Sequence, residues 1–538
     1  MSKLGNYLKE HLKGEILESP EIRNYFSRDL SPIQVIPSMI AFPADERDIR
    51  KINRFCYQLS ERGRFLPITP RGLGSSSNGS SLGSGLIMSM STHLNKINYI
   101  DQKNLIVNVQ AGINFNLFKE SMNLLGMELP FNPENYKNIT LAGIISSNLS
   151  GNTSHKYGGI ENCLLGLKVV LSNGEIIEVK QITLKEFNHK IGQVNFEGEV
   201  YRNLDKLIED LDISDLKREV SRDSAMYNIS DIKNKDGVNL IPLFIGSEGT
   251  LGVITEVTLK LKEIDQDFSK YLLVGLENNL DTAELLSNLM GLGDSPDYIE
   301  YFDSNLFKML NKSSPTHFNR WLNRPYSKGY LLLGFRGPDK TVIKNYQKII
   351  KSIKGISNNI FEINENEEIS LLDRLNSSKI EVENYQDHNQ SVYNVLNISV
   401  PKNNIAELLN GLDSVFKKSP INLAYYGNLA EGNLTIVGLI DVNEVADRQA
   451  YFKVIKDGSD LAVSLGGTMA ANGGVGRLST PYLYKQFTEQ NLEIFRKIKK
   501  IFDPMNILNP DVKFNSTEEN IKNSLTNKIK LRNKENIQ

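Results

Sequence analysis

The sequence predicts an α+β protein with more than one structural unit, and three observations lead to this prediction. The chain has 538 residues, enough for roughly two to four domains. In its first half an amphipathic helix is followed by short apolar runs bounded by Gly, Ser, Asn and Asp, which are typical of strands. From about residue 265 longer strands alternate with helical stretches, which indicates a second domain with one sheet covered by helices.

In the first half, residues 44–63 repeat apolar side chains at helical spacing, begin with acidic residues and end on Gly63, which predicts an amphipathic helix. Ser172 to Gly174 (SNG) predicts a hairpin turn between two of the strands. The strands predicted here are residues 85–90, 105–110, 167–172 and 175–179.

The second half continues this pattern to a proline-rich stop, FDPMNILNP, at residues 502–510. A long helix over residues 484–502 precedes this stop, and the polar residues from Ser516 onward predict a solvated or weakly helical tail. The predicted strands are 269–278, 296–303, 329–337, 392–400, 421–428 and 433–442, and the predicted helices between them are 281–290, 341–353 and 403–416.

Composition excludes several classes of protein. The chain is 40% hydrophobic and 23% charged, within the range of globular proteins, and its net charge of -2 gives no global field for nucleic acid. Cys56 and Cys163 form no C-x-x-C pair, which argues against zinc ribbons and iron–sulfur clusters held by four thiolates, and the six histidines show no metal-binding spacing. The sequence has no apolar run of transmembrane length and no recognisable signal peptide, so the expected location is the cytoplasm.

Residues 67–90 (PITPRGLGSSSNGSSLGSGLIMSM) form the first motif with chemical content. Gly72, Gly74 and Gly79 stand among small hydroxyl residues just before a strand. Glycine permits positive φ, and successive backbone N–H groups of such a loop can cradle a pyrophosphate. The motif is neither a Rossmann fingerprint, because residue 77 is Ser77 and the loop precedes a strand, nor a P-loop, because no G-K-[ST] follows. Taken alone, a Gly/Ser loop of this kind is most often a simple turn.

Two further strings accompany it. Residues 132–175 are dense in Asn, Thr, Ser and Gly and run into an apolar strand, a composition that suits a cleft for a flat polar ring or, alternatively, a long irregular loop. Residues 243–262 (LFIGSEGTLGVITEVTLKLK) place apolar runs on both sides of a G-S-E-G turn and by themselves predict a β-hairpin.

Together, in this order, the three strings resemble the FAD-binding domain of the vanillyl-alcohol oxidase / p-cresol methylhydroxylase superfamily. The resemblance is to the branch that contains D-lactate dehydrogenase, the glycolate oxidase flavin subunit and D-2-hydroxyglutarate dehydrogenase. It covers residues 36–514, since YGNLAEGNLTI (426–436), GGTMAANGGVGR (466–477) and FDPMNILNP also match. It implies a two-part FAD-binding domain of the PCMH type and an α+β cap domain with one largely antiparallel sheet covered by helices. The implied units are an N-terminal helical segment (1–35), the FAD domain (36–263), the cap (264–480), a C-terminal helix returning to the FAD domain (481–515) and a polar tail (516–538).

The resemblance also implies FAD as the cofactor. Some relatives attach the flavin to a histidine at the position of Ser75, so the FAD is expected to be noncovalent here. The loop would bind the pyrophosphate, residues 140–158 would line the flavin and ribityl side, residues 248–254 the adenosine side, and Asn509 would approach the ring system. Arg71 is either a salt-bridge partner of the pyrophosphate or a structural residue at the loop edge. The implied cofactor-binding residues are Pro70, Arg71, Gly72, Leu73, Gly74, Ser75, Ser76, Gly79, Pro133, Thr140, Leu141, Gly143, Asn148, Tyr157, Gly158, Glu248, Gly249, Gly252, Val253, Ile254 and Asn509.

This sequence departs from the branch at its metal site. The family's G-H-x-x-D-G-N-x-H and G-E-H-G strings supply two metal-binding histidines, a glutamate and a catalytic histidine. Here those positions are Asn428, Thr435, Asn472 and Gly473. None of these groups is a good metal ligand or a base near neutral pH, so no metal is expected.

The remaining candidates for chemistry are Arg374, Tyr425, Tyr426, Asn428 and Asn433. The resemblance places Arg374 where the branch holds a substrate carboxylate, for which a guanidinium is a natural bidentate partner. Oxidation of an alcohol by flavin also needs a base for the hydroxyl proton. That base is a tyrosine (Tyr425, Tyr426 or Tyr393), Glu431 or an ordered water.

The leading hypothesis is an FAD-dependent oxidoreductase that oxidises a small hydroxylated substrate, such as a 2-hydroxy acid, without a metal. Its electrons would pass to a quinone, a carrier protein or oxygen. The alternatives are an FAD enzyme acting on a sugar, a polyol or a redox-neutral substrate, and a flavin-binding protein that has lost catalysis. Cations in the tail (Lys522, Lys528, Lys530, Arg532 and Lys534) suit either a solvated end or a peripheral contact with an anionic membrane surface.

Overall fold

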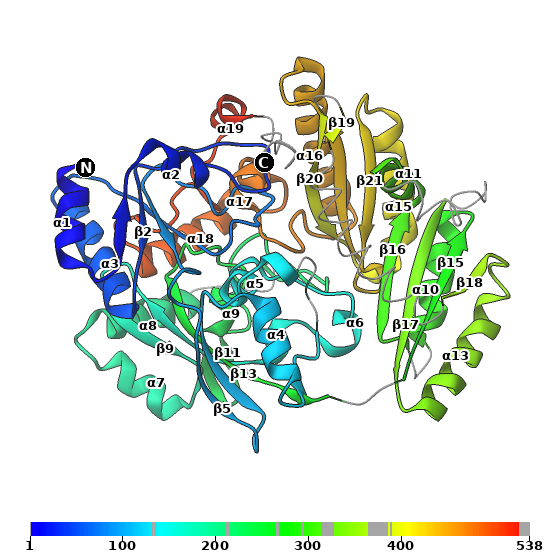
Figure 1. Ribbon diagram of the computed structural model, residues 1–538, viewed down its shortest axis with the longest axis horizontal. Coiled ribbons are helices and arrows are strands. Elements are labelled where there is room, and N and C mark those ends of the chain that lie inside the picture. Colours follow the sequence, from blue (N-terminus) through cyan, green and yellow to red (C-terminus); the bar gives the residue numbers. More distant parts are fainter. Residues whose placement is uncertain are drawn as a thin grey trace, which may run out of the picture.

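The computed structural model describes residues 2–131, 133, 136–209, 216–264, 268–291, 295–313, 328–363, 386–387 and 390–526. Helices and strands are mixed along the chain and form two parts, which lie to the left and right in Figure 1. The predicted α+β class is confirmed, including a cap whose single sheet is antiparallel and covered by helices.

A four-stranded sheet forms the first half of the left-hand part. Its order is β1-β2-β4-β3; β4 pairs in parallel with both β2 and β3, while β1 is antiparallel to β2. The predicted amphipathic helix begins one residue after Asp45, whose side chain accepts hydrogen bonds from Arg47 N and Asp48 N. The elements are α1 (Lys3–His11), β1 (Glu15–Leu17), α2 (Pro20–Tyr25), β2 (Met39–Phe42), α3 (Glu46–Glu61), β3 (Ile68–Arg71) and β4 (Leu86–Ser89).

A five-stranded antiparallel sheet of order β5-β6-β13-β8-β9 forms the second half. The predicted turn joins β8 to β9, with Gly174 at φ +84°. The elements are β5 (Ile97–Asp101), β6 (Ile106–Gln110), α4 (Phe115–Asn123), β7 (Met127–Glu128), α5 (Leu141–Ser147), α6 (Ser154–Tyr157), β8 (Leu164–Val170), β9 (Ile176–Val179), β10 (Gln181–Ile182), α7 (Leu184–Ile191), α8 (Phe196–Glu209), β11 (Lys233–Asn234), β12 (Gly237–Asn239), α9 (Ile241–Phe244), β13 (Val253–Lys260) and β14 (Lys262–Glu263).

The hairpin predicted over residues 243–262 is wrong in its first arm. Residues 241–244 form the short helix α9, while the second arm is strand β13. Pro242 stands in the first turn of α9, and the side chain of Asn239 accepts a hydrogen bond from Ile241 N. Leu243 and Phe244 are fully buried, and a short apolar run buried on all sides shows no periodicity that separates helix from strand.

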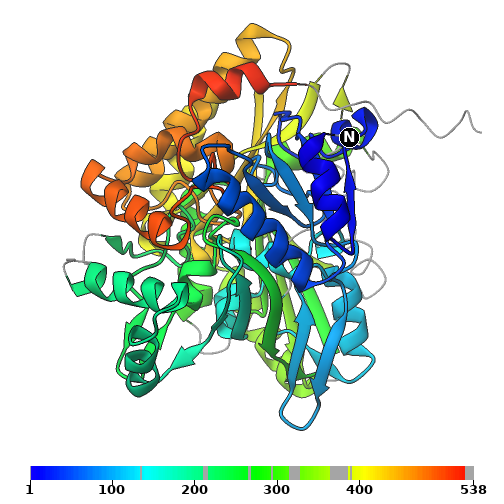
Figure 2. The same ribbon diagram turned by 90° about the vertical axis from the view of Figure 1, so that its left-hand side faces the viewer.

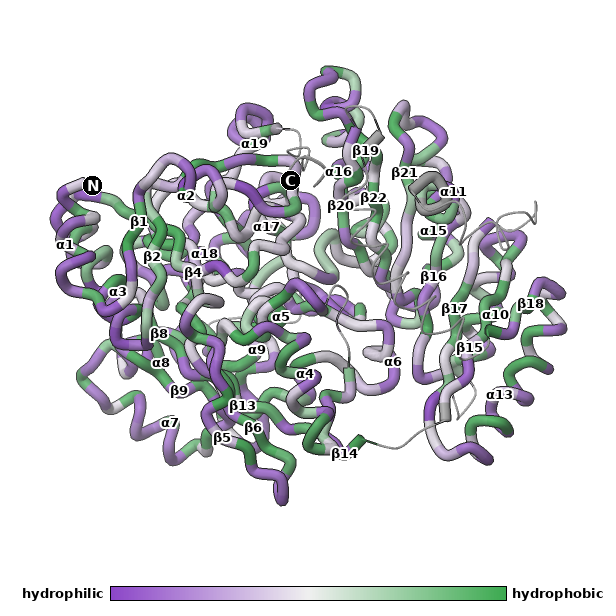
Figure 3. The backbone as a smooth tube through the Cα atoms, viewed as in Figure 1, coloured by the Kyte–Doolittle hydropathy of each residue, from purple (hydrophilic) through white to green (hydrophobic). Residues whose placement is uncertain are grey.

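The cap is an eight-stranded sheet of order β18-β15-β17-β16-β21-β22-β20-β19, antiparallel throughout. Helices α10, α13, α15 and α16 pack on one face. Apolar residues gather on the strands, and hydrophilic residues follow the outer turns of the helices (Figure 3). The elements are β15 (Phe268–Leu276), α10 (Asn279–Gly291), β16 (Tyr298–Asp303), α11 (Ser304–Ser313), β17 (Gly329–Gly337), α13 (Asp339–Ile353), β18 (Ile360–Ile363), β19 (Gln386–Asp387), β20 (Gln390–Ser399), α15 (Ile405–Lys417), β21 (Asn422–Gly427), β22 (Asn433–Ile440) and α16 (Val445–Ser464).

The chain then continues through α17 (Gly476–Ser479), α18 (Glu489–Phe502) and α19 (Glu518–Ser524). Phe495, Ile498 and Phe502 of α18 join the core beneath the five-stranded sheet. Within the stretch expected to be a solvated or weakly helical tail, Glu518–Ser524 form the short helix α19, and most residues of 516–526 are exposed or half-buried. Thr517 caps α19, Ile521 is buried, and Leu525 forms a bridge with Ile33, so two apolar residues four apart anchor this helix (Figure 2). Among the helices of the described ranges, none is both long and apolar enough to cross a membrane.

Candidate functional site

A cleft opens beside the glycine-rich loop that follows β3. Fourteen of the residues expected to bind FAD line it: Pro70, Arg71, Gly72, Leu73, Gly74, Ser75, Ser76, Thr140, Gly143, Glu248, Gly249, Gly252, Val253 and Ile254. Further lining residues include Ser146, Ser147 and Gly473, which sequence reasoning did not single out.

The backbone of the loop presents hydrogen-bond donors to this cleft. Within the described part of the chain, the N–H groups of Leu73, Gly74, Ser75 and Ser76 have no hydrogen-bond partner. Gly74 has φ +75°, and a Cβ atom on Gly72 would lie 2.5 Å from Thr140 Oγ1. A concave row of unsatisfied donors with no side chains in the way fits a pyrophosphate dianion, so the cleft passes this test for a dinucleotide.

Arg71 lies beneath the loop. Its guanidinium donates to three backbone carbonyls, those of Phe26 (3.1 Å), Arg28 (2.7 Å) and Ser81 (3.4 Å). Burial lowers the pKa of the Arg71 guanidinium. The sequence left open whether Arg71 binds the pyrophosphate or is a structural residue. These contacts favour the structural role, in which Arg71 fixes the loop to the N-terminal segment.

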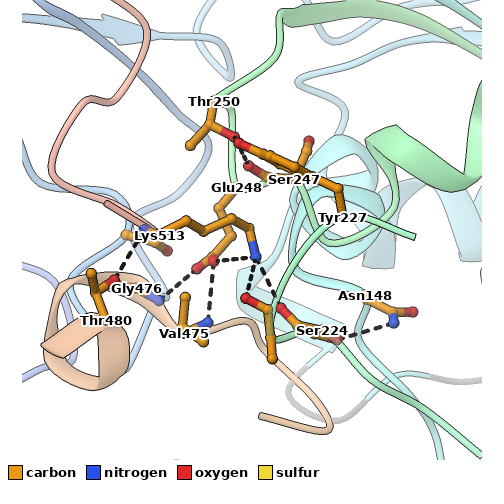
Figure 4. A network of polar contacts seen from close by, with 12 residues as sticks. Asn148, Ser224, Tyr227, Ser247, Glu248, Thr250, Val475, Gly476, Thr480 and Lys513 are labelled. Carbon is orange, nitrogen blue, oxygen red and sulfur yellow. Dashed lines mark hydrogen bonds and ion pairs between the residues drawn. The ribbon is translucent and has the colours of Figure 1, made fainter. Parts of the chain in front are cut away.

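Glu248 ties together the segments that close the cleft (Figure 4). Its carboxylate accepts hydrogen bonds from Val475 N (3.1 Å) and Gly476 N (2.9 Å), and lies 3.3 Å from Lys513 Nζ. Both charged side chains are fully buried, and burial raises the pKa of Glu248 and lowers that of Lys513. Lys513 also donates to the carbonyls of Ser224 and Ala225. The ion pair therefore holds the cleft against segments 224–225 and 475–476.

Asn509 does not line the cleft. It is fully buried, and its amide nitrogen donates to the carbonyls of Ser80 (2.8 Å) and Glu248 (2.9 Å). It thus connects the end of the loop to the residue that anchors the ion pair. Gly79 and Leu141 also lie outside the lining of the cleft.

The remaining cofactor candidates lie farther along the chain. Asn148 has φ +49° and bonds to Arg222 and Ser224. The hydroxyl of Tyr157 donates to Asp297 (2.7 Å), and burial raises the pKa of Tyr157. Gly158 has φ +73°, and Pro133 forms a bridge with Gly151. None of these four residues lines the cleft.

Residues 150–157 meet the cap at a contact that we call the joint, together with β16 and the turn 428–433. The carbonyl of Asn152 accepts a hydrogen bond from Ile299 N (3.1 Å), and its amide nitrogen donates to Glu300 (3.3 Å). The joint adjoins the cleft, because Ser150 follows the lining residue Leu149 and its N–H donates to Asn472, the neighbour of the lining residue Gly473.

His155 is the histidine of the joint. One ring nitrogen, Nε2, lies 2.8 Å from the carbonyl oxygen of Pro296, and Nδ1 lies 3.4 Å from the amide nitrogen of Asn428. Because a carbonyl only accepts hydrogen bonds, we assign the proton to Nε2, which leaves Nδ1 as an acceptor. Burial lowers the pKa of His155 below its usual value of 6.5, so the ring is neutral at pH 7.

The positions where the resemblance expects metal ligands are joined by hydrogen bonds instead. Asn397 accepts from Asn472 N (3.0 Å) and donates to Thr435 (2.8 Å), and the side chain of Asn472 accepts from Ser150 N (2.9 Å). Asn428 donates to the carbonyls of Gly151 and Asn152. Over the described ranges, the structure holds no group of three His, Cys, Asp or Glu side chains arranged for a metal.

A buried charge cluster adjoins the same turn. Arg222 pairs with Glu161 (3.3 Å) and lies 3.7 Å from Glu431, whose carboxylate also accepts from Asn433 Nδ2 (3.1 Å). Burial raises the pKa of Glu431, although Arg222 opposes this shift. Sequence reasoning missed Arg222, Lys513 and His155, because only the fold shows which partners they meet.

The candidate tyrosines lie on opposite faces of the cap sheet. Tyr425 and Tyr393 are buried in the core under the helices, and the ring of Tyr425 stacks on Tyr301 with centroids 5.8 Å apart. Tyr426 lies on the other face, in the cluster that includes Phe302 and Tyr330. Tyr425 and Tyr393 therefore do not face the joint. Arg374 falls outside the described residues.

Comparison with protein families gives two successive matches along the chain. Residues 37–180 match the FAD binding domain family, and residues 266–512 match the C-terminal domain of FAD linked oxidases. The chain belongs to the FAD-linked oxidases. FAD is therefore the cofactor of this chain, in agreement with the donor-lined cleft.

Relatives of this FAD-linked oxidase are distant but extend over most of the chain. The glycolate oxidase subunit GlcD of Bacillus subtilis is 26% identical over 91% of this chain and 92% of its own length. The mitochondrial D-lactate dehydrogenase [cytochrome] of Kluyveromyces lactis is 24% identical over 90% of this chain and 75% of its own length.

Solved structures share the fold. A 4-ethylphenol oxidase from Gulosibacter chungangensis aligns with a TM-score of 0.67 at 13% identity, covering 96% of this chain and 99% of its own. An alkyldihydroxyacetonephosphate synthase aligns with a TM-score of 0.62 at 16% identity, covering 92% of this chain and 82% of its own.

Proposed function

We propose that this protein oxidises a small hydroxylated substrate with a noncovalently bound FAD, and that a 2-hydroxy acid is the first substrate to test. The observation that carries the proposal is the row of unsatisfied N–H donors in a cleft that adjoins the joint. Relatives named for glycolate and D-lactate oxidation support the substrate class.

Noncovalent binding is supported by the residues around the cleft. Its lining contains no histidine, cysteine or tyrosine among the described residues, and Ser75 stands at the position where some relatives carry a flavin-linked histidine. A serine hydroxyl is a poor nucleophile without an adjacent base. Acid precipitation is therefore expected to release the flavin into the supernatant.

We assign to His155 the role of the base that accepts the proton of the substrate hydroxyl. When bound, the flavin supplies the acceptor for the hydride that leaves the carbinol carbon. His155 Nδ1 is an acceptor on a neutral ring, and its contact with Asn428 at 3.4 Å is long for a hydrogen bond. Pro296 holds the ring orientation through Nε2. In this proposal His155 is the base, in place of the tyrosine, Glu431 or ordered water between which the sequence left the choice open. Arg374 keeps its expected role of binding a substrate carboxylate.

A second candidate is a neutral polyol or sugar. The side-chain oxygens of Asn428 and Asn433 are buried and have no hydrogen-bond partner within the described part of the chain. Amide oxygens accept hydrogen bonds from hydroxyl groups and repel carboxylates. Two such acceptors in one turn favour a substrate with several hydroxyl groups.

Anaerobic reduction of the purified flavoprotein separates these functions. D-lactate, glycolate or D-2-hydroxyglutarate are expected to bleach the flavin absorption bands between 300 and 550 nm, which would support the first candidate. Bleaching by sugars or polyols alone would support the second. A flavin reduced only by dithionite would contradict both and indicate a protein that has lost catalysis. A colourless protein that takes up no added FAD would contradict the enzyme function itself.

A further inference from the structure

A groove of about 710 Å³ lies between α16 and α19, separate from the cleft and the joint. The two helices lie side by side in both orientations of the ribbon (Figures 1 and 2). Tyr482 lies between them. The groove residues on α16 share one helical face, since they recur every three or four positions. They are Val445, Arg448, Gln449, Phe452, Lys453 and Lys456, and α19 contributes Glu518, Lys522 and Asn523.

The groove carries an excess of positive charge. Four cations line it (Arg448, Lys453, Lys456 and Lys522), against the single acid Glu518. Glu518 already pairs with Lys522 (2.5 Å) and accepts a hydrogen bond from the hydroxyl of Tyr482 (2.9 Å). These bonds lower the pKa of Glu518, and the bond from Lys522 contributes most. The carboxylate is therefore ionised and already has hydrogen-bond partners. Lys456 also acts on Glu518 through its charge, yet one acid among four cations leaves the groove with a net positive charge.

The unbalanced cations are available to a ligand. Lys453 and Lys456 are exposed, and among the described residues neither has a hydrogen bond or an ion pair. The guanidinium of Arg448 donates to the carbonyls of Val442 and Asn443, which orient it without neutralising its charge. Charge-assisted donors of this kind are natural partners of phosphate oxygens.

The spacing of the cations indicates the size of the ligand. Residues 448 and 456 are eight positions apart, which corresponds to about 12 Å along the helix axis. A single phosphate would have to draw the two charged ends together against their mutual repulsion, whereas a diphosphate with an attached group can contact them while they stay apart. A concave groove of this volume is in the range of small-molecule sites. We propose that this groove binds a diphosphate-bearing small molecule of nucleotide size.

The chain's own C-terminal residues are a poor alternative occupant. The sequence after residue 526 carries Lys528, Lys530, Arg532 and Lys534 and only one acidic residue. Like charges repel, so a sequence of this charge is a poor ligand for a cationic groove.

Titration calorimetry on the FAD-loaded protein tests the proposal, because the loaded cleft cannot take up a second diphosphate. Inorganic pyrophosphate and ADP are expected to bind saturably at low ionic strength, and more weakly as salt is added. The double substitution Lys453→Glu/Lys456→Glu is expected to weaken binding by about tenfold or more, because two charge-assisted contacts are lost. The matched control is Lys344→Glu/Lys348→Glu on α13, which makes the same change of charge on an exposed helix face and should leave binding unchanged.

Hydrogen exchange provides a second readout. Bound ADP is expected to slow exchange in α19, because the ligand bridges that helix to α16. Failure of pyrophosphate and ADP to bind, or equal weakening by the control variant, would overturn the proposal. Binding to anionic vesicles without binding of either soluble diphosphate would also overturn it and indicate a membrane surface instead. These measurements do not depend on substrate oxidation, so the groove and the enzymatic function fail or succeed separately.

Discussion

The FAD cleft and the joint adjoin each other, yet the chain builds them from different chemical groups. The cleft presents backbone N–H groups, glycines and small hydroxyls, and its charged residues Arg71 and Glu248 are engaged in holding segments together. The joint presents the side chains of Asn428, Glu431 and His155. A backbone surface constrains the sequence only where glycine is needed, so it stays recognisable at low identity. A surface of side chains changes its chemistry with each substitution.

Breaking the cleft has the largest expected effect. Gly74→Asp should abolish FAD retention, because Gly74 has φ +75° and an added Cβ would lie 2.2 Å from the Arg71 guanidinium, so the loop that presents the N–H donors would have to shift. The measurement is the ratio of flavin to protein absorbance after purification. Gly126→Asp is the matched control, since Gly126 has nearly the same φ (+74°) and no atom within 4 Å of an added Cβ. A Gly74→Asp protein that purifies yellow would refute the placement of the loop.

Breaking the chemistry of the joint should leave FAD in place. His155→Gln is expected to lower the anaerobic rate of flavin reduction by about 10²–10⁴-fold, the usual contribution of a general base. His189→Gln, at an exposed histidine on α7, is the control and should keep the wild-type rate. An unchanged rate in His155→Gln together with a reducible wild-type flavin would remove His155 from the mechanism and leave the enzyme function standing.

The pH dependence sharpens this test. A base must be neutral, and burial lowers the pKa of His155 below 6.5, while Lys156 and Lys402 lower it further and Asp297 opposes them. The reduction rate should therefore stay constant above pH 6.5 and fall only as the pH drops through the lowered pKa. His155→Gln should lose this dependence. An NMR titration of the His155 ring reports the same pKa without turnover.

The same contrast explains what the sequence could predict. The glycine loop was recognisable because Gly72 and Gly74 are needed locally, and the cap strands because they are short apolar runs bounded by turn residues. The fully buried run at Leu243 was wrongly predicted to be a strand, since burial on all sides hides helical periodicity. Arg222 meets Glu431 across 209 positions of sequence, and no local pattern announces such a contact. The same holds for Lys513 and Glu248, which are 265 positions apart.

Removing one partner of the buried ion pair tests how the cleft is held. Lys513→Met leaves Glu248 buried without its cation, which should lower the free energy of unfolding by about 3–5 kcal/mol. Urea unfolding of the FAD-loaded protein measures the change. Lys217→Met removes a surface partner of Asp231 and should cost less than about 1 kcal/mol. Equal effects of the two substitutions would show that the buried pair does not hold the segments around the cleft.

The smallest expected effect concerns metals. Beside the joint, Asn397 bonds to Thr435 and to the backbone of Asn472, and the side chain of Asn472 bonds to Ser150 of the joint, so these oxygens and nitrogens already have protein partners. Neutral amides and hydroxyls are also weak ligands for zinc compared with histidine and carboxylate. Prolonged dialysis against a chelator, and later addition of zinc or manganese, should leave the rate of flavin reduction unchanged. Activity that chelator removes and zinc restores would mean that other residues, including those outside the described ranges, bind a metal at the joint. The difference between the joint and the metal-binding branch of the family would then lie in the position of the ligands and not in their loss.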